Sequence, residues 1–492
     1  MKTQLFLILY IIIGLHGIYA QQLKSTPATF TSKSGKEVRA EIGTIQVSEN
    51  RKNLNASIIP IHFIKLKSSN PSPNPPIFYL EGGPGSSCTW QASNPGYLEN
   101  WLPYLELGDV VLIDQRGTGA ETNRTVFIWE KELPKNLFVN VEAYQKHLNE
   151  MSQEALKVYN DRGVDLQGYT TLENANDIDD LRQALGYDKI SLYGFSYGTH
   201  LGQTYMKYYK EYVKNAVLIG VEGFNDTFKL PLSMDVQLRK IALLFNNSSS
   251  IHKEIPDLFA LYKKVTRKIK QNPIEVEITS ALTGKPIKVL VGPYGLNTIL
   301  RIDIGDASDI PVLPRFLYGI DQGDYSMLQW FVQKRHQMVY GIHGMSITMD
   351  AASGASSSRI AQIEQENQKS LFKNVVNVST EEKWPIKDLG EYFRAPLVTD
   401  IPTLFLSGSL DFNTPPYQAE QAKWGYSNSH HIVVKNAGHE QIVYHPKAQE
   451  TILRFFKSDT IDNVTMSYPP IKFIPVTGIS EILWHPSMGD KK

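Results

Sequence analysis

The hydrophobic and polar positions of the chain fall into two kinds of pattern. Residues 38–47 and 57–66 alternate apolar and polar side chains, which indicates antiparallel strands with one buried face. Later in the chain, apolar side chains instead gather in short runs, which is typical of parallel strands buried on both faces. The runs span residues 77–80, 110–113, 190–193, 216–219, 403–406 and 431–434.

Helical patterns separate several of these runs. We expect Thr171 to cap a helix that ends before Gly186. Its apolar residues fall on one stripe: Leu172, Ala175, Ile178, Leu181 and Leu185. Strands that alternate with helices predict a doubly wound α/β fold with a mostly parallel central sheet.

The alternation lapses between the run at 216–219 and the run at 403–406. This stretch contains amphipathic helical patterns at 255–269 and 327–339, so it predicts a mainly helical insertion, either a cap over the sheet edge or a second domain. The predicted organisation is a signal peptide at 1–20, a core at 21–222 and 399–458, a cap at 223–398 and a C-terminal extension at 459–492, for which the sequence indicates no function.

Composition narrows the class of protein. The 492 residues include 50 basic and 50 acidic side chains, so there is no positive excess to neutralise nucleic-acid phosphates. The hydrophobic share of 42% is typical of a globular protein. Cys88 is the only cysteine, which excludes an internal disulfide.

The first residues predict export. Lys2 supplies a positive end, residues 5–15 an apolar core, and Tyr19-Ala20 a cleavage point before Gln21. We therefore expect a secreted or periplasmic protein with no membrane attachment after cleavage. The bulky Ile18 near the cleavage point leaves an uncleaved signal anchor as the alternative.

One motif predicts a nucleophile. Gly194-Phe-Ser196-Tyr-Gly198 follows an apolar run and opens a helical pattern, the strand–turn–helix context of a nucleophile elbow. The sharp turn needs small residues on both sides and pushes the Ser196 hydroxyl above the sheet.

A serine needs a base and an orienting acid, and both follow in the required order. Asp411 comes just after the run at 403–406, and His439 just after the run at 431–434. We expect His200 to face a neighbouring layer. The sequence after His439 lacks the second histidine of a His-Glu-x-x-His site, so no metal or other cofactor is indicated.

Two further motifs follow strand ends. Glu81-Gly-Gly-Pro84-Gly85 predicts an oxyanion hole in which the N–H of Gly83 acts with that of Tyr197. Pro84 has no N–H to offer. Arg116, in the Asp114-Gln-Arg116 motif, is interpreted as structural, because a fixed guanidinium can bond loop carbonyls.

Together, residues 80–85, 114–119 and 194–198, Asp411 and Gly438-His439 resemble the proline iminopeptidase and tripeptidyl aminopeptidase family of α/β-hydrolases. The resemblance covers roughly residues 35–456. It implies a serine peptidase acting at the N-termini of short peptides, with Ser196 as nucleophile, His439 as general base and acid, and Asp411 fixing the imidazole tautomer.

The resemblance also implies an acid in the cap that binds the substrate's ammonium group. Asp350 is the first candidate, because residues 345–350 most resemble the cap segment that carries it, and Glu222 is the second. The chain departs from the family at Glu81, Glu121 and Met349, which leaves the size of the leaving group and the preference for proline open.

Two other functions stay open. The same triad serves an esterase or amidase acting on small acyl substrates. A binding module on a hydrolase shell is the alternative outside enzymes, although such modules usually lose a triad residue and all three are present here.

Overall fold

The computed structural model describes residues 23–70, 73–247, 251–305, 309–377, 384–458, 461 and 464–476. The predicted signal peptide and the end of the predicted C-terminal extension lie outside these residues. Within the described part, no helix is both long and apolar enough to cross a membrane.

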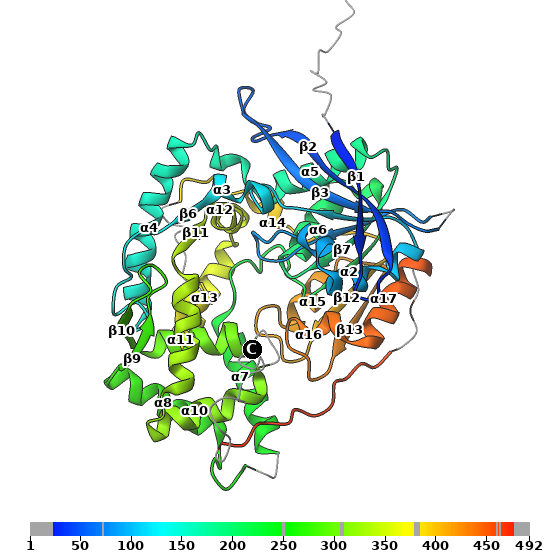
Figure 1. Ribbon diagram of the computed structural model, residues 1–492. Coiled ribbons are helices and arrows are strands. Elements are labelled where there is room, and N and C mark those ends of the chain that lie inside the picture. Colours follow the sequence, from blue (N-terminus) through cyan, green and yellow to red (C-terminus); the bar gives the residue numbers. More distant parts are fainter. Residues whose placement is uncertain are drawn as a thin grey trace, which may run out of the picture.

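A nine-stranded sheet forms the centre of the core, in the order β1-β2-β3-β5-β4-β7-β8-β12-β13 (Figure 1). From β5 to β13 the neighbours are parallel, whereas β1, β2 and β3 form an antiparallel edge that joins β5. The strands are β1 Leu23–Thr31, β2 Glu37–Ser48, β3 Ile58–Leu66, β4 Ile77–Leu80, β5 Val110–Ile113, β7 Ile190–Phe195, β8 Val213–Ile219, β12 Thr403–Gly408 and β13 Ser429–Val434.

The predicted mostly parallel sheet is therefore confirmed. Every residue of β4, β5 and β12 is buried, as the unbroken apolar runs predicted. The first strand, β1, was not predicted, because its sequence is mainly polar and contains Pro27, and its side chains are mostly exposed at the sheet edge.

Helices cover both faces of the sheet. One face packs on α5 Thr171–Ala184 and α6 Tyr197–Tyr208. The other packs on α1 Trp90–Ser93, α2 Pro95–Trp101 and α17 Pro446–Ser458. The predicted cap of α5 is displaced by one residue: the hydroxyl of Thr170, and not that of Thr171, accepts the N–H of Glu173.

The insertion between β8 and β12 is mainly helical, as predicted, with one hairpin. Its elements are α7 Pro231–Asn246, α8 Leu258–Gln271, β9 Ile274–Thr279, β10 Pro286–Val291, α9 Pro293–Ile299, α10 Leu313–Gln322, α11 Ser326–Met338, β11 Gly341–His343, α12 Gly344–Ser353, α13 Ser357–Lys369 and α14 Glu391–Arg394. The predicted helical patterns at 255–269 and 327–339 correspond to α8 and α11.

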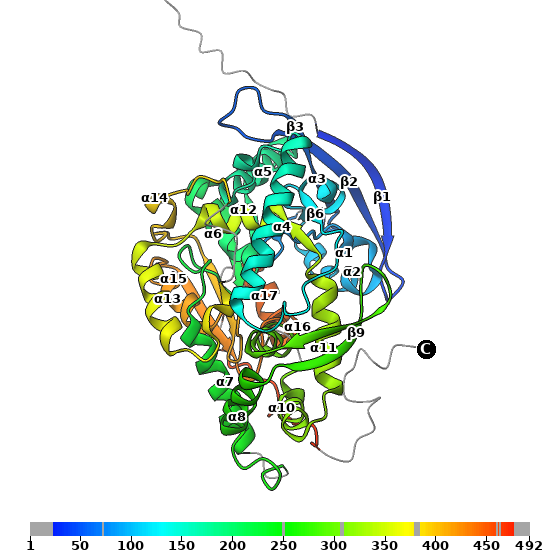
Figure 2. The same cartoon turned by 90° about the vertical axis from the view of Figure 1, so that its left-hand side faces the viewer.

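The cap also takes in a segment that was predicted to belong to the core. β6 Val126–Ile128 pairs antiparallel with β11, and α4 Val141–Asp161 buries Met151 and Tyr159 in the apolar cluster of the cap. Figure 1 and Figure 2 both show α4, in cyan, among the cap elements. The apolar stripe of α4 thus packs on the cap and not on the sheet.

Residues 464–476 run from the core to the cap (red in Figure 1). At the core, the N–H of Tyr468 donates to the carbonyl of Lys435 at 3.0 Å. At the cap, the N–H of Ile474 donates to Pro311 at 3.1 Å, and the Phe473 ring packs on Phe245. We call residues 464–476 the C-terminal segment. The remaining short elements are α3 Thr122–Thr125, α15 Pro416–Lys423 and α16 Gln441–Tyr444.

Candidate active site

Ser196 lies on the sharp turn between β7 and α6. Its backbone has φ 54° and ψ −124°, which is strained for any residue with a side chain. A Cβ at Gly194 would lie 2.6 Å from the carbonyl oxygen of Gly198, and one at Gly198 would lie 1.9 Å from that of Leu80. Only glycine fits at both positions, so the local geometry is that of a nucleophile elbow.

Asp411 and His439 meet at the carboxyl ends of β12 and β13. The Nδ1 atom of His439 lies 2.7 Å from Oδ2 of Asp411, whose side chain is fully buried. Oδ1 of Asp411 accepts the N–H groups of Asn413 and Thr414, and the Thr414 hydroxyl donates to Oδ2 at 2.7 Å. Nδ1–H of His439 therefore faces the acid, which leaves Nε2 as the nitrogen available to a nucleophile.

These contacts keep Asp411 ionised. Burial by itself raises the pKa of the Asp411 carboxyl, but the charge and hydrogen bond of His439, together with the two hydrogen bonds donated by Thr414, lower it below its ordinary value. An anionic Asp411 can stabilise an imidazolium on His439.

The imidazole of His439 also lies beside the elbow. Its ring centroid is 5.0 Å from that of Phe195, the residue before Ser196. A Cβ at Gly220, just after β8, would lie 2.8 Å from Cε1 of His439, and the N–H of Ser196 donates to Ile219, the residue before Gly220. The structure thus brings all three predicted residues to one edge of the sheet.

The loop after β4 approaches Ser196 from the other side. A Cβ at Gly82 would lie 3.0 Å from Cβ of Ser196. The N–H of Gly82 donates to the side chain of Glu81 at 2.8 Å, so it is already engaged. Gly83, the predicted donor, follows with φ +116°. Tyr197 begins α6, where a backbone N–H has no acceptor within its own helix.

Two family models match the chain in the segments that hold these residues. A model described as alpha/beta hydrolase fold matches residues 75–248, and one described as TAP-like protein matches residues 369–467. The chain has the α/β-hydrolase fold. The comparison with curated proteins found no match.

Solved structures that resemble this hydrolase share little of its sequence. Rv0554 from Mycobacterium tuberculosis is 15% identical, with 84% of this chain and 98% of that chain covered and a TM-score of 0.39. A thermophilic esterase from Thermogutta terrifontis is 14% identical, with 84% of this chain and 98% of that chain covered and a TM-score of 0.33. An epoxide hydrolase mutant from Vigna radiata is 15% identical, with 85% of this chain and 97% of that chain covered and a TM-score of 0.33.

Gln115 fixes the loop after β4, a role that the sequence analysis missed. Its side-chain amide donates to the carbonyls of Glu81 and Gly82, at 2.9 and 3.1 Å, and its oxygen accepts the N–H of Gly85 at 3.0 Å. The one available signal was its place in the Asp114-Gln-Arg116 motif, which does not reveal where an amide points.

The structural interpretation of Arg116 is confirmed. Its fully buried guanidinium donates to the carbonyls of Glu49 and Gly168 and makes two hydrogen bonds to Asp177. The hydrolase core thus anchors separate loops through one side chain.

The cap helix α12 lies against the same edge. The hydroxyl of Ser346 donates to the carbonyl of Pro84 at 2.7 Å, and the Tyr197 hydroxyl donates to Sδ of Met349 at 3.0 Å. Asp350 follows directly in α12 and is half-buried. Burial raises the pKa of the Tyr197 hydroxyl, and the negative charges of Asp350 and Glu222 raise it further, so both predicted acids act on the residue after Ser196.

Glu222 is buried and ion-paired. Its Oε2 lies 2.5 Å from Nζ of Lys229, whereas no hydrogen-bond partner for Oε1 is found among the described residues. His200, the rival base, is fully buried, and its ring nitrogens contact Gly223 and Ser353, in agreement with its expected position in a neighbouring layer. No group of metal-ligating side chains occurs in the described part of the chain.

Proposed function

We propose that this hydrolase is an exported serine aminopeptidase that cleaves short peptides near their N-terminus. The observation that carries the proposal is the buried pair of Asp411 and His439, 2.7 Å apart, beside the elbow of Ser196. The TAP-like model over residues 369–467 supports a peptidase.

In the proposed reaction, Ser196 Oγ attacks the carbonyl carbon of the scissile peptide bond while Nε2 of His439 takes its proton. The N–H groups of Gly83 and Tyr197 stabilise the oxyanion. The imidazolium, held by Asp411, then protonates the leaving amine. Nε2 of His439 then takes a proton from water as the water oxygen attacks the acyl carbon, and the imidazolium returns the proton to Ser196 Oγ as the C–Oγ bond breaks and the acid product leaves.

The acids near Tyr197 support recognition of a free N-terminus. An ammonium group donates three hydrogen bonds and prefers carboxylates. Oε1 of Glu222 is a buried acceptor without a partner among the described residues, and Asp350 reaches the same region from the cap. Lys229 offsets one negative charge. Together, Asp350 and Glu222 would position the N-terminus relative to Ser196.

The first test addresses the nucleophile. We expect a serine-directed fluorophosphonate to label the wild-type protein and not Ser196→Ala, and hydrolysis of aminoacyl anilides to fall by about 10⁴-fold or more in that variant. An unlabelled wild-type protein would favour the binding module.

The same assays separate the peptidase from the esterase. We expect Asp350→Asn to raise KM for anilides with a free amino group by about tenfold and to leave N-blocked substrates unchanged. Asp400→Asn, at a position that is 75% exposed, is the matched control. Much faster cleavage of simple acyl esters, unaffected by Asp350→Asn, would instead assign an esterase.

A further inference from the structure

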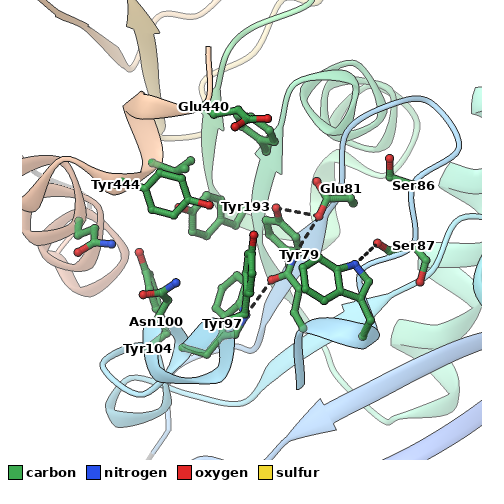
Figure 3. A pocket seen from close by; sticks show the side chains of 16 residues that line it. Tyr79, Glu81, Ser86, Ser87, Tyr97, Asn100, Tyr104, Tyr193, Glu440 and Tyr444 are labelled. Carbon is green, nitrogen blue, oxygen red and sulfur yellow. Dashed lines mark hydrogen bonds between the residues drawn. The ribbon is translucent and has the colours of Figure 1, made fainter. Parts of the chain in front are cut away.

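A pocket of about 330 Å³ lies beside the Glu81–Gly85 loop (Figure 3). It lies between the ends of β4 and β7, the α1–α2 region and the segment after His439. None of its 16 lining residues comes from the insertion between β8 and β12. The pocket is therefore separate from the Asp350 and Glu222 region under the cap.

The charged side chains that line the pocket are all acidic. Glu81 and Glu440 line it, and no lysine, arginine or histidine does. Among the ion pairs of the described residues, neither carboxylate has a cationic partner. Burial raises the pKa of the Glu81 carboxyl above its ordinary value, although Gly82, Tyr79 and Gln91 donate hydrogen bonds to it. A bound cation would offset this cost of burial.

The rest of the wall is largely aromatic. Eight of the 16 lining residues carry aromatic rings: Tyr79, Trp90, Tyr97, Trp101, Tyr104, Tyr193, Phe195 and Tyr444. Ring contacts such as Trp90–Tyr97, at 4.5 Å between centroids, and Tyr79–Trp101, at 5.0 Å, fix their positions. Trp90 and Tyr444 remain 43% and 50% exposed. Aromatic faces beside carboxylates attract organic cations, and guanidinium both stacks on rings and pairs with carboxylates.

The pocket is one residue away from each part of the reaction centre. Glu81 precedes Gly82, where an added Cβ would lie 3.0 Å from Cβ of Ser196; Phe195 precedes Ser196; and Glu440 follows His439. The pocket wall and the reaction centre thus share three segments: the loop after β4, the end of β7 and the loop after β13.

We propose that this pocket is a specificity site for the guanidinium or ammonium group of a basic side chain in the substrate. Its role in substrate choice rests on the proposed function, but binding to the pocket does not require catalysis.

The test uses calorimetry on Ser196→Ala, which keeps the pocket and cannot form an acyl-enzyme. The probes are Nα-acetyl-argininamide and its citrulline counterpart, a neutral molecule of nearly the same shape. The acetyl group keeps either probe from using the predicted ammonium site. We expect the arginine probe to bind about tenfold more tightly than the citrulline probe.

Variants locate the binding. Adding Glu440→Gln or Trp90→Leu should reduce the preference for arginine to about threefold or less, and Glu81→Gln should abolish it. Since Glu81→Gln sets an amide against the Gln91 amide, the other two variants, at exposed positions, decide the outcome if it fails to fold. Glu450→Gln, at a position that is 71% exposed, is the matched control.

Equal affinity for the two probes, or a preference for arginine that survives Glu440→Gln and Trp90→Leu, would overturn the proposal. Arginine binding in the pocket of a protein that hydrolyses no peptide would keep the site and remove the proposed function. Peptide hydrolysis together with equal affinity for the two probes would support the proposed function and overturn the specificity site.

Discussion

The core and the cap each bury an arginine, but they use it differently. In the core, Arg116 pairs with Asp177 and also donates to main-chain carbonyls of two loops. In the cap, Arg335 pairs with Asp303 at 2.7 Å, while its Nε and both ring nitrogens of the adjacent His336 have no hydrogen-bond partner among the described residues.

The difference shows which part of the molecule holds its loops in place through buried hydrogen bonds. Buried polar groups rigidify a structure when they are fully satisfied, and they cost stability when they are not. Arg116 and Gln115 hold the loops around Ser196, so the core is built to keep atoms in place. In the cap, by contrast, Nε of Arg335 and the ring nitrogens of His336 are buried without a hydrogen-bond partner among the described residues, which costs stability.

The largest expected effect comes from exchanging the two arginines for methionine. Arg116→Met should lower the free energy of unfolding by about 3–5 kcal/mol, because it leaves Asp177 and several carbonyls without that donor. Arg335→Met should cost only about 1–2 kcal/mol, since Nζ of Lys334 stays 2.9 Å from Asp303. Urea unfolding measures both, and equal losses would remove the contrast.

An intermediate effect is expected at Gln115. Gln115→Ala should lower kcat for peptide substrates by about 10- to 100-fold with little change in KM, because the Glu81–Gly85 loop loses three hydrogen bonds. Gln362→Ala, which removes an exposed hydrogen bond to Glu366 in α13, is the control. A rise in KM at constant kcat would mean that Gln115 does not position the oxyanion hole.

The smallest expected effect is on the stability of the cap at acidic pH. Burial lowers the pKa of His147 and of His336, although Glu150 and Glu132 partly oppose this. An unfolded histidine has a pKa near 6.5, so the unfolded chain binds protons first as the pH falls. The contribution of these neutral histidines is present above that pH and is lost below it.

We therefore expect these two histidines of the cap to supply part of the loss of stability between about pH 7.5 and pH 5. Replacing His147 and His336 with leucine should reduce the acid-induced drop of the urea midpoint by about 0.3 M. The exposed His430, changed to glutamine, is the control. An unchanged pH dependence in the double variant would exclude these two histidines as its source.

The sequence predicted the sheet well because its burial pattern is local. Short apolar runs such as residues 110–113 are typical of strands buried on both faces, and the glycines at 194 and 198 flank Ser196 within one five-residue motif. The edge strand β1 and the packing of α4 on the cap were not predicted, because an exposed strand has no apolar alternation and an amphipathic helix does not reveal which surface it covers.

In the candidate site, too, local motifs could be predicted and contacts between distant segments could not. The order of Ser196, Asp411 and His439 could be read from motifs at strand ends, and the structure places the acid and the imidazole in contact. Gln115, Thr414 and the aromatic pocket could not be predicted, since each depends on side chains from distant segments that meet only after folding.

The C-terminal segment sets a mechanical limit on the cap. It is held at Ser467 by a bridge to Lys435 and at Ile474 by Pro311, and the Tyr468 hydroxyl donates to the carbonyl of Gln441, two residues after His439. Seven residue steps can reach at most ~24 Å. The separation of these two attachment points therefore has an upper bound. A displacement of the cap away from the core beyond that bound would extend the segment fully and transmit force to residues 435–441, which include His439.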